Sequence, residues 1–431
     1  MIRHDEQTTT KLGFGRAGLW TTLALAILAL GSCDFEVTNP GPVQDTFLND
    51  SDAYLAIVNG AGRDLAEGLN YVAYHGSMPT RELFPTGGTG QFGISIRNAD
   101  GFLDPQEQNQ PWNLMQRARW TAEDGLRRFE EYMEPSTFQS SELVAEIALW
   151  AGYSNRTLGE NMCQAIIDEG PIQPRETFLT RAEGHFTRAI EVGGAAGASE
   201  LATAARAGRA AVRVHLGDWS GALSDAASVP DDFAFAMPYF NRGNLDEYNR
   251  IGYAVGNEPY KTNTVWNTVY EDYFLDSGDP RVAWEDTGLP GDGGLACCGS
   301  VPFYRQLKFD REGDMNLSSS QEMRLIEAEG ALVEGDWEGA MDLINAIRAD
   351  HGVAARTASN AAEAWTHLKR ERGIALWLEG RRLGDLYRWD AAGTPGEMDP
   401  LEVVGSESYL LSQDLCFPIP DSERDTNPNV S

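Results

Sequence analysis

The sequence predicts a mostly α-helical protein in which paired helices are interrupted by an irregular region rich in aromatic residues. Three observations support this fold class. From about residue 140 the chain is rich in Ala and Gly at helical spacing. A short Gly-Asp-Trp turn occurs twice, at residues 217–219 and 335–337. Between the two turns, residues 231–310 hold 15 of the 42 aromatic residues, together with many Gly, Pro and Asn residues.

Each Gly-Asp-Trp turn lies between two helix patterns, and the second helix has apolar or small residues at i, i+3, i+4 and i+7. The first copy contains Gly208, Ala211, Val212 and His215, then Trp219, Ala222, Leu223 and Ala226; the second contains Ile326, Gly330 and Val333, then Trp337, Ala340, Met341 and Ile344. Small residues at such positions let two helices approach closely, as in tetratricopeptide units. We therefore expect tetratricopeptide-like units at about residues 140–230 and 319–390.

The two copies are 118 residues apart, which is not a multiple of the roughly 34-residue tetratricopeptide period. The helical array is therefore expected to be interrupted, with an irregular insertion at residues 231–318. Two unrelated helical hairpins that share a Gly-Asp turn are the alternative interpretation. The insertion is expected to be ordered, because disordered linkers are poor in aromatic residues.

The first 32 residues are predicted to be a targeting signal. Residues 19–30 carry no charge, but twelve residues are too few to span a bilayer, which needs about 20. The run ends at Leu30-Gly31-Ser32-Cys33, which resembles the lipobox of bacterial lipoproteins. On this resemblance Cys33 is expected to be lipidated and to begin a single mature domain, residues 33–431. An ordinary signal peptide or an uncleaved anchor is the alternative.

The segments before residue 140 are predicted from turn and capping residues. Residues 34–48 are Pro-rich and are predicted to form an extended tether. Ser51 or Asp52 is placed to cap a helix that runs to about Glu67. Residues 71–110 are expected to be loop-like, and a helix is expected from about Pro111 to Met133.

The aromatic residues of the insertion allow two interpretations. Trp266, Tyr270 and Tyr273 recur at i, i+4 and i+7, which is typical of the buried stripe of a short helix. Alternatively, some rings form an exposed platform that stacks on sugar rings or peptide side chains. The candidate ligand contacts under this second interpretation are Trp266, Tyr270, Trp284, Tyr304 and Trp112.

A last helical segment is expected from about residue 361 to residue 389, with Leu376, Gly380, Leu383 and Tyr387 on one face. Arg381 and Asp385 are expected to pair at i, i+4. The chain should then break at residues 393–396 and end in an extended segment at residues 416–420, which contains two prolines.

Charge and cysteine content limit the partners and cofactors. The formal net charge of −31 argues against nucleic acid and against electrostatic docking on anionic lipid. It fits a soluble body at a cell surface and makes a neutral or basic ligand a better guess than an acidic polysaccharide. Four cysteines follow Cys33, namely Cys163, Cys297, Cys298 and Cys416, and they allow three disulfide pairings. No CxxC occurs and the six His residues have no ligand spacing, so no metal site and no cofactor are expected.

Catalytic motifs are missing from the sequence. There is no GxSxG, no HExxH, no GxxxxGK[ST] and no GxGxxG after a strand. The Gly-rich stretch at residues 87–90 lacks the lysine of a phosphate-binding loop, so a surface loop is expected there. Acidic residues are numerous, but no motif marks a pair for glycoside hydrolysis. The sequence therefore predicts a protein that is not an enzyme, and no residue is assigned a catalytic role.

The order of several short motifs resembles the SusD/RagB family of outer-membrane nutrient-binding lipoproteins. The matching motifs are Cys33 with Asn39-Pro40, Asp279-Pro280-Arg281, residues 324–329, Gly335-Asp336-Trp337, residues 344–348, Glu371-Arg372, residues 379–382, residues 385–389, residues 417–420 and Asn427-Pro428-Asn429. They are spread over nearly all of the mature chain. They are scaffold features and identify no ligand, so no binding residue is transferred by motif.

This resemblance implies a mostly helical body of four tetratricopeptide-like units that support an irregular ligand-binding face. It also implies a lipoprotein of the outer membrane that faces the exterior and delivers a glycan or a peptide to a SusC-like TonB-dependent transporter. A lipid-anchored helical-repeat scaffold that binds only proteins is the alternative function. That alternative explains the paired helices but gives the aromatic-rich insertion no role.

Overall fold

The structure is a computed structural model that describes residues 45–87, 95–255 and 260–430. The chain divides into two compact units, residues 1–45 and 46–431, and the elements discussed below belong to the second unit. The predicted targeting signal, Cys33 and most of the Pro-rich tether lie outside the described residues, as do residues 88–90 of the Gly-rich stretch.

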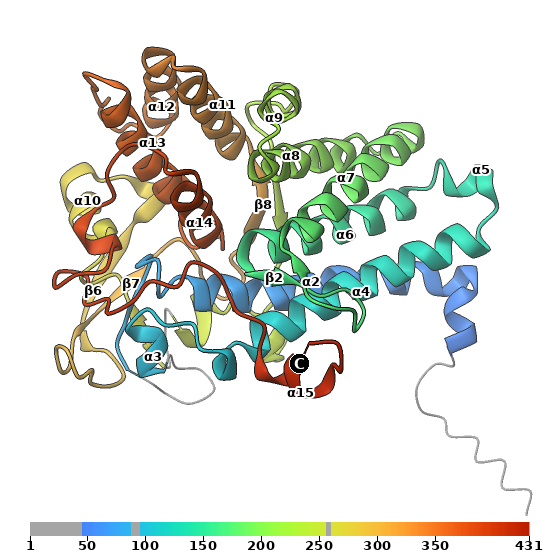
Figure 1. Cartoon of the computed structure of the whole chain (residues 1–431), viewed down its shortest axis with the longest axis horizontal. Helices are drawn as coiled ribbons and strands as arrows, with labels where there is room; N and C mark the ends of the chain where they lie inside the picture. The colour runs from blue at the N-terminus through green and yellow to red at the C-terminus, as the bar shows by residue number, and fades with distance from the viewer. Residues whose placement is uncertain (1–44, 88–94, 256–259, 431) are drawn as a thin grey trace, which may run out of the picture. The chain divides into compact units, whose positions relative to one another are not determined.

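Helices make up most of the second unit (Figure 1). In chain order they are α2 (Tyr54–Gly76), α3 (Ile96–Ala99), α4 (Asn109–Tyr132), α5 (Pro135–Phe138), α6 (Glu142–Asn161), α7 (Glu176–Ala196), α8 (Ser199–Leu216), α9 (Trp219–Ala226), α10 (Val269–Ser277), α11 (Ser320–Glu334), α12 (Trp337–Asp350), α13 (Ala361–Ala375), α14 (Arg382–Ala392) and α15 (Asp421–Thr426). The prediction of a mostly helical protein with tetratricopeptide-like units and an irregular insertion is confirmed.

The strands in the described residues are short and pair two by two, always antiparallel. They are β1 (Phe84–Pro85), β2 (Gln164–Ala165), β3 (Gln173–Pro174), β4 (Ala234–Met237), β5 (Asn263–Thr264), β6 (Trp284–Pro290), β7 (Pro302–Gln306) and β8 (Met315–Ser319). The pairs are β1–β5, β2–β3, β4–β8 and β6–β7. Five of these strands and α10 lie between residues 231 and 319, so the irregular insertion is an ordered structure wherever it is described.

The helices before residue 140 agree in part with the sequence. The helix α4 spans Asn109–Tyr132, close to the expected range. The helix α2, however, continues to Gly76, beyond the expected end at Glu67. Its last turns bury Leu69, Val72 and Ala73. Because of this packing, residues after position 70 that were expected to form a loop are helical.

Both Gly-Asp-Trp turns have the same local chemistry. Gly217 and Gly335 end α8 and α11 with φ of 77° and 89°, a left-handed conformation that glycine adopts without steric cost. Asp218 and Asp336 then cap the next helix, because their carboxylates accept from the backbone N–H groups three residues later, at 3.0 Å and 2.9 Å. The repeated turn is therefore a helix end followed directly by a helix start.

The helices next to the two turns also pack against each other. Figure 1 shows α6, α7, α8 and α9 in succession, with α11 beside α9. An ideal Cβ at Gly330 of α11 would lie 2.7 Å from Leu223 of α9, so the missing side chain makes room for the leucine. This contact joins the two tetratricopeptide-like units that the insertion separates in the sequence.

Two glycines also create the space for a buried ring. Phe186 of α7 is fully buried, and an ideal Cβ would lie 2.6 Å from its ring at Gly152 of α6 and 2.4 Å from it at Gly208 of α8. Such distances are far inside van der Waals contact, so a side chain at either position must displace the ring. The small residue at position 208 is thus required for close helix packing, as the sequence pattern indicated.

We expect Gly208→Ala to lower the free energy of unfolding by about 1–3 kcal/mol, the usual cost of overpacking, although Ala has the higher helix propensity. The control is Gly194→Ala on α7, where no atom lies within 4 Å of the added Cβ. That variant should be neutral or more stable by up to about 1 kcal/mol. Urea unfolding curves measure both changes, and equal stabilities of the two variants would show that Phe186 does not need the space.

The segment after α12 differs from its sequence prediction. One helix was expected over residues 361–389, but α13 ends at Ala375 and α14 begins at Arg382. The chain turns between them, with φ of 63° at Leu378 and 71° at Gly380. The predicted face that joined Leu376 and Gly380 to Leu383 therefore does not exist. The expected break at residue 393 is confirmed, because Gly393 ends α14 with a φ of 60°.

The C-terminal segment is extended, as expected, and is fixed to α6. Phe417 is buried, donates its N–H to Asn161 O at 2.8 Å and accepts from Cys163 N at 2.9 Å. A disulfide between Cys163 and Cys416 holds the same contact, and Cys297 is bonded to its neighbour Cys298. Of the three pairings that the sequence left open, this is the one the structure shows.

Buried ion pairs connect the helical units, and many of them involve the motif residues. Glu160 of α6 accepts from Arg156 at 2.6 Å and from Arg381 at 3.0 Å, and Arg156 also pairs with Glu322 of α11. Asp385 of α14 pairs with Arg372 at 2.8 Å. The expected Arg381–Asp385 pair is therefore wrong, because Arg381 precedes α14 and points instead to α6.

Candidate functional site

Two aromatic rings stack at the surface on the β6–β7 hairpin. Trp284 begins β6 and Tyr304 lies in β7, and the antiparallel register sets Asp286 opposite Tyr304. The two ring centroids are 4.5 Å apart with an interplanar angle of 20°. The Trp284 indole N–H donates to Glu271 O at 3.2 Å, which fixes the ring against α10. Both residues are half-buried, so ring surface remains available to a ligand.

A third ring, Trp266, lies just before α10 and is also half-buried. Its ring meets Phe84 edge to face, with centroids 5.0 Å apart. Thr264 Oγ1 accepts from the backbone N–H of Trp266 at 3.1 Å and from that of Tyr304 at 2.8 Å. This threonine therefore joins the two chain segments. We call the three residues Trp266, Trp284 and Tyr304 the aromatic face.

An open groove of about 860 Å³ borders the other side of α10. Its lining includes Asn267, Glu271, Tyr273, Arg356, Asp399 and Tyr409. Glu271 links the groove to the aromatic face, because its main-chain oxygen holds Trp284 while its carboxylate accepts from Asn267 N at 2.6 Å. We call this concavity the α10 groove. Its size is in the range of small-molecule sites, roughly 300–1,000 Å³.

The floor of the α10 groove rests on buried ion pairs. Tyr273 donates to Asp279 at 2.8 Å and accepts from Arg348 of α12 at 3.1 Å. Arg281 pairs with Asp279 and with Glu371 of α13, each at 2.7 Å. The residues Asp279 and Glu371 belong to the motifs noted in the sequence. Their role here is to fix α10 to the second helical unit, which supports the site without touching a ligand.

Several groups at the site have shifted pKa values. Burial and the neighbouring Asp272 raise the pKa of Glu271, whereas the hydrogen bond from the backbone N–H of Asn267 lowers it in part. Burial raises the pKa of Tyr304, and the charges of Glu271 and Asp286 add to this effect. Burial lowers the pKa of Arg356, with Arg348 adding repulsion, and the buried Nε of Arg356 has no hydrogen-bond partner in the described structure. The site thus contains one polar group, the Nε of Arg356, whose hydrogen-bonding capacity is not used.

Two of the five aromatic residues proposed from the sequence lie in the core instead. Trp112 has 0% exposure, and its indole N–H donates to Glu423 at 3.2 Å. Tyr270 is 1% exposed and packs on Trp377 with ring centroids 5.1 Å apart. Neither ring offers a face to a ligand, so these two are corrected to core residues. Trp266, Trp284 and Tyr304 lie together on the hairpin and at the start of α10.

Sequence reasoning missed the groove residues that come from distant segments. Tyr409 and Arg356 lie more than 50 residues from any residue of the aromatic face, and no motif marks them. Asn267 and Tyr409 have positive φ, both 56°, which only the three-dimensional structure reveals. An exposed tryptophan on α4, Trp120, with 54% exposure, was also not singled out.

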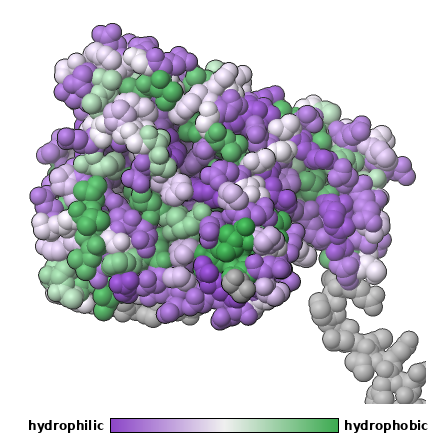
Figure 2. Space-filling view, in the orientation of Figure 1, coloured by the Kyte–Doolittle hydropathy of each residue, from purple (hydrophilic) through white to green (hydrophobic). Residues whose placement is uncertain are grey.

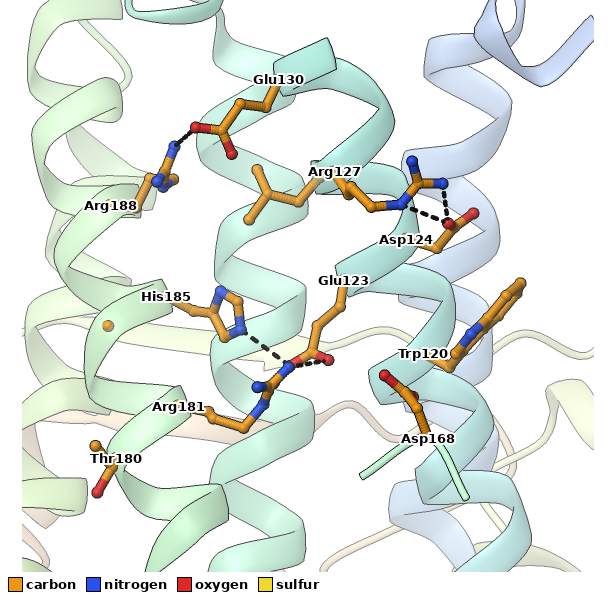
Figure 3. A pocket seen from close by; sticks show the side chains of 12 residues that line it. Trp120, Glu123, Asp124, Arg127, Glu130, Asp168, Thr180, Arg181, His185 and Arg188 are labelled. Carbon is orange, nitrogen blue, oxygen red and sulfur yellow. Dashed lines mark hydrogen bonds and ion pairs between the residues drawn. The ribbon is translucent and has the colours of Figure 1, made fainter. Parts of the chain in front are cut away.

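Trp120 borders a different groove, between α4 and α7, with a volume of about 570 Å³. Figure 3 shows that charged side chains from the two helices reach across it and bind each other. Arg181 and His185 of α7 contact Glu123 at 2.6 Å and 3.0 Å, and Arg188 contacts Glu130 at 3.4 Å. Although burial opposes it, these contacts hold the pKa of Glu123 far below its usual range. The side chains satisfy one another, so this groove is a helix–helix contact and the α10 groove is the better candidate site.

Within the described ranges, no three or more His, Cys, Asp and Glu side chains are grouped in a way that could hold a metal ion. In the same residues, no helix combines the length and the apolar character that a bilayer span requires. Figure 2 shows a mainly hydrophilic surface over the helical units, with hydrophobic residues more frequent on the side of α10 and β6.

Comparison with known proteins gives a match to a family model over the C-terminal part of the chain and a shared fold over most of its length. Residues 321–431 match the model of the SusD family. A SusD homolog from Bacteroides thetaiotaomicron has a TM-score of 0.67 at 14% identity, with 90% of this chain and 98% of that chain covered. A SusD superfamily protein from Bacteroides vulgatus has a TM-score of 0.61 at 15% identity, with 89% and 99% covered.

A third solved structure, a laminarin binding SusD-like protein, has a TM-score of 0.60 at 16% identity, with 89% of this chain and 98% of that chain covered. The search of curated proteins gives no match. The shared fold extends over about nine tenths of the chain, and the family match covers the segment that contains α11 to α15. The chain therefore has the fold of the SusD-like proteins, and its residues 321–431 match the SusD family model.

Proposed function

We propose that the protein is a lipid-anchored capture protein of the cell surface, without catalytic activity, that binds a glycan at the aromatic face and the α10 groove. It would pass this ligand to a SusC-like TonB-dependent transporter in the outer membrane. A peptide ligand is the alternative within the same mechanism. The observation that carries the proposal is the stacked Trp284–Tyr304 pair beside an open groove in which Arg356 Nε has no hydrogen-bond partner.

The chemistry of this site suits sugar rings. One face of a pyranose is apolar and packs on a flat aromatic surface, and Trp284 with Tyr304 offers such a surface. Sugar hydroxyl groups both donate and accept, so they can meet the carboxylate of Glu271 and the guanidinium of Arg356 in the groove. The net charge of −31 makes a neutral or basic glycan more favourable than an acidic one.

Two solved relatives support a glycan as the ligand class. One is described as a laminarin binding SusD-like protein, and another, from Bacteroides vulgatus, as a SusD-like carbohydrate binding protein. These proteins are 16% and 15% identical to this chain, so they support the class of ligand and not a particular sugar.

The proposal is tested with a soluble form that begins at Asp34 and lacks the proposed lipid site. All hydrophobic core residues described lie in the second unit, which this form retains. We expect saturable binding to at least one neutral oligosaccharide in a glycan panel, without release of shorter products. Binding of no glycan and no peptide, with stable co-purification of a helical partner, would instead favour a scaffold that binds only proteins. Product release would favour an enzyme.

Replacement of Cys33 by serine should abolish lipidation, because the acylated atom is the cysteine sulfur. In cells fed a fatty-acid probe, we expect the wild-type chain to be labelled and Cys33→Ser to remain unlabelled and accumulate as the unprocessed precursor. The control is Cys297→Ser, which removes a cysteine of the mature body and should leave labelling unchanged. Equal labelling of Cys33→Ser and wild type would contradict the anchor.

A further inference from the structure

A separate concavity of about 490 Å³ lies between α2, α6 and the chain that follows β4, and we call it the α2–α6 pocket. Its apolar lining includes Trp150, Met237, Tyr239 and Phe240, and its carboxylates are Glu146, Asp246 and Glu247. None of the residues that line it also lines the α10 groove or belongs to the aromatic face. It is therefore a distinct site.

The walls of this pocket are fixed by contacts between distant segments. Tyr239 donates its hydroxyl to Ala66 O of α2 at 2.9 Å, and Phe240 donates its N–H to Glu247 O at 2.8 Å. Trp150 of α6 is 8% exposed and lies against Gly62, where an ideal Cβ would be 3.4 Å from the indole. The pocket is thus built into the fold of the second unit and is not a gap beside a loose loop.

Polar groups in the pocket lack partners. The buried Nε1 of Trp150 and the buried Oε2 of Glu247 make no hydrogen bond of normal geometry within the described residues. Neither Glu146 nor Glu247 is ion-paired with any described cation. A buried indole N–H or a buried carboxylate oxygen without a hydrogen-bond partner costs free energy, so a ligand that satisfies both gains affinity.

The two arginines that line the pocket have partners other than Glu146 and Glu247. Arg63 pairs with Glu67 at 3.3 Å and with Asp64 at 3.7 Å, and Arg242 lies over the Phe240 ring at 4.1 Å. Asp246 has Arg250 at 4.0 Å. The two carboxylates that remain for a ligand are therefore Glu146 and Glu247.

The electrostatic environment of Glu146 is that of a carboxylate without a positively charged partner. Burial and the charge of Glu142 raise the pKa of this carboxyl. The Trp150 N–H lies close enough to lower it in part, but it makes no hydrogen bond of normal geometry with the carboxylate. A positive charge beside Glu146 would favour its ionised form. The aromatic face of Trp150 also attracts cations.

We propose that the α2–α6 pocket binds a ligand that carries a primary ammonium next to a hydroxyl or carbonyl oxygen. The ammonium would lie between Glu146 and Glu247, and the neighbouring oxygen would accept from Trp150 Nε1. The carbon skeleton would pack on Phe240. An amino sugar and the N-terminus of a peptide share this chemistry. The inference does not depend on the proposed function, because the pocket and the aromatic face have no residue in common.

The test is calorimetric titration at pH 6.5, where an α-ammonium keeps its proton. The probes are glucosamine and alaninamide, each compared with its N-acetylated form, which has no charge. We expect one of the charged probes to bind at the pocket and its acetylated form to bind at least tenfold more weakly. Glucosamine alone would identify the source as an amino sugar, and alaninamide alone as a peptide N-terminus.

Three variants locate the binding. Glu247→Gln and Glu146→Gln keep the shape of the side chain and should each weaken the charged probe tenfold or more. Glu142→Gln removes an exposed carboxylate one turn away on α6 and should change the affinity less than twofold. Trp284→Ala, on the aromatic face, should leave this binding unchanged even if it abolishes glycan binding.

Three results would overturn the inference: no binding of either charged probe, equal binding of the acetylated forms, or equal loss in Glu142→Gln and Glu247→Gln. None of these results bears on the aromatic face, which is tested separately by oligosaccharide titration. Unfolding curves of the Gln variants show whether they remain folded. Should Glu146→Gln unfold, Glu247→Gln, at the end of a short 3-10 helix, decides the outcome.

Discussion

Replacing Arg156 with methionine is expected to lower the free energy of unfolding by about 3–5 kcal/mol, the cost of leaving buried charges unpaired. Arg156 is 1% exposed and binds Glu160 of α6 at 2.6 Å and Glu322 of α11. It also donates to Leu317 O of β8 at 3.0 Å. Methionine keeps much of the side-chain volume but leaves Glu322 without its cation. The substitution should loosen the contacts among α6, β8 and α11, which connect the insertion to both helical units.

The pKa of Glu160 shows how much this cluster depends on its cations. Burial alone raises that pKa, but Arg156 and Arg381 lower it to about 2. A carboxyl with a lowered pKa contributes stability above its unfolded value, and that stability is lost as the pH falls through the folded value. The Arg156→Met variant should therefore lose most stability, relative to wild type, at neutral pH, and the difference should shrink towards pH 2.

Urea unfolding at pH 7 measures this prediction, with Arg127→Met on α4 as the control. Arg127 pairs with Asp124 and Glu131, but its side chain is 56% exposed, so its loss should cost less than about 1 kcal/mol. A change below 1 kcal/mol in Arg156→Met would mean that the cluster is not what holds the units together.

The largest functional effect is expected from Trp284→Ala, which should weaken oligosaccharide binding by at least tenfold. The substitution removes the ring that stacks on Tyr304 at 4.5 Å and leaves Tyr304 without its support. Loss of the aromatic side chain on which a nucleobase stacks costs about 1–3 kcal/mol of binding free energy, and we expect a similar cost for a stacked sugar ring. A tenfold weaker affinity corresponds to about 1.4 kcal/mol.

The matched control is Trp120→Ala, which removes a more exposed tryptophan from another groove. Titration of both variants with the same neutral oligosaccharide separates loss of the aromatic face from a general loss of surface tryptophan. Equal affinities for wild type and Trp284→Ala, or a larger loss in Trp120→Ala, would move the glycan site away from the β6–β7 hairpin.

The sequence predicted best what depends on neighbouring residues. Both Gly-Asp-Trp turns could be identified because a left-handed glycine and a capping aspartate act within four residues of each other. The close approach at Gly208 could also be expected from small residues at helical spacing. The end of α13 could not, because the left-handed turn is centred on Leu378, a residue with no local preference for it.

Long-range contacts decided the features that the sequence could not show. Trp112 and Trp284 are equally plausible ligand contacts in the sequence, but Trp112 is fully buried and donates its indole N–H to Glu423, 311 residues away. The i, i+4 spacing of Arg156 and Glu160 is typical of an exposed pair, yet both are buried because α11 and Arg381 pack over them. The α10 groove combines α10, α13 and the chain around Tyr409, which only the fold brings together.

The most direct test of a glycan site at the aromatic face is a crystal structure of the soluble form with a bound neutral oligosaccharide. We expect a sugar ring parallel to Trp284 or Tyr304 at van der Waals distance, about 3.5–4.0 Å, with its hydroxyl groups directed into the α10 groove. A sugar seated instead beside Trp120, or in the α2–α6 pocket alone, with the aromatic face empty, would contradict the proposed function of this site.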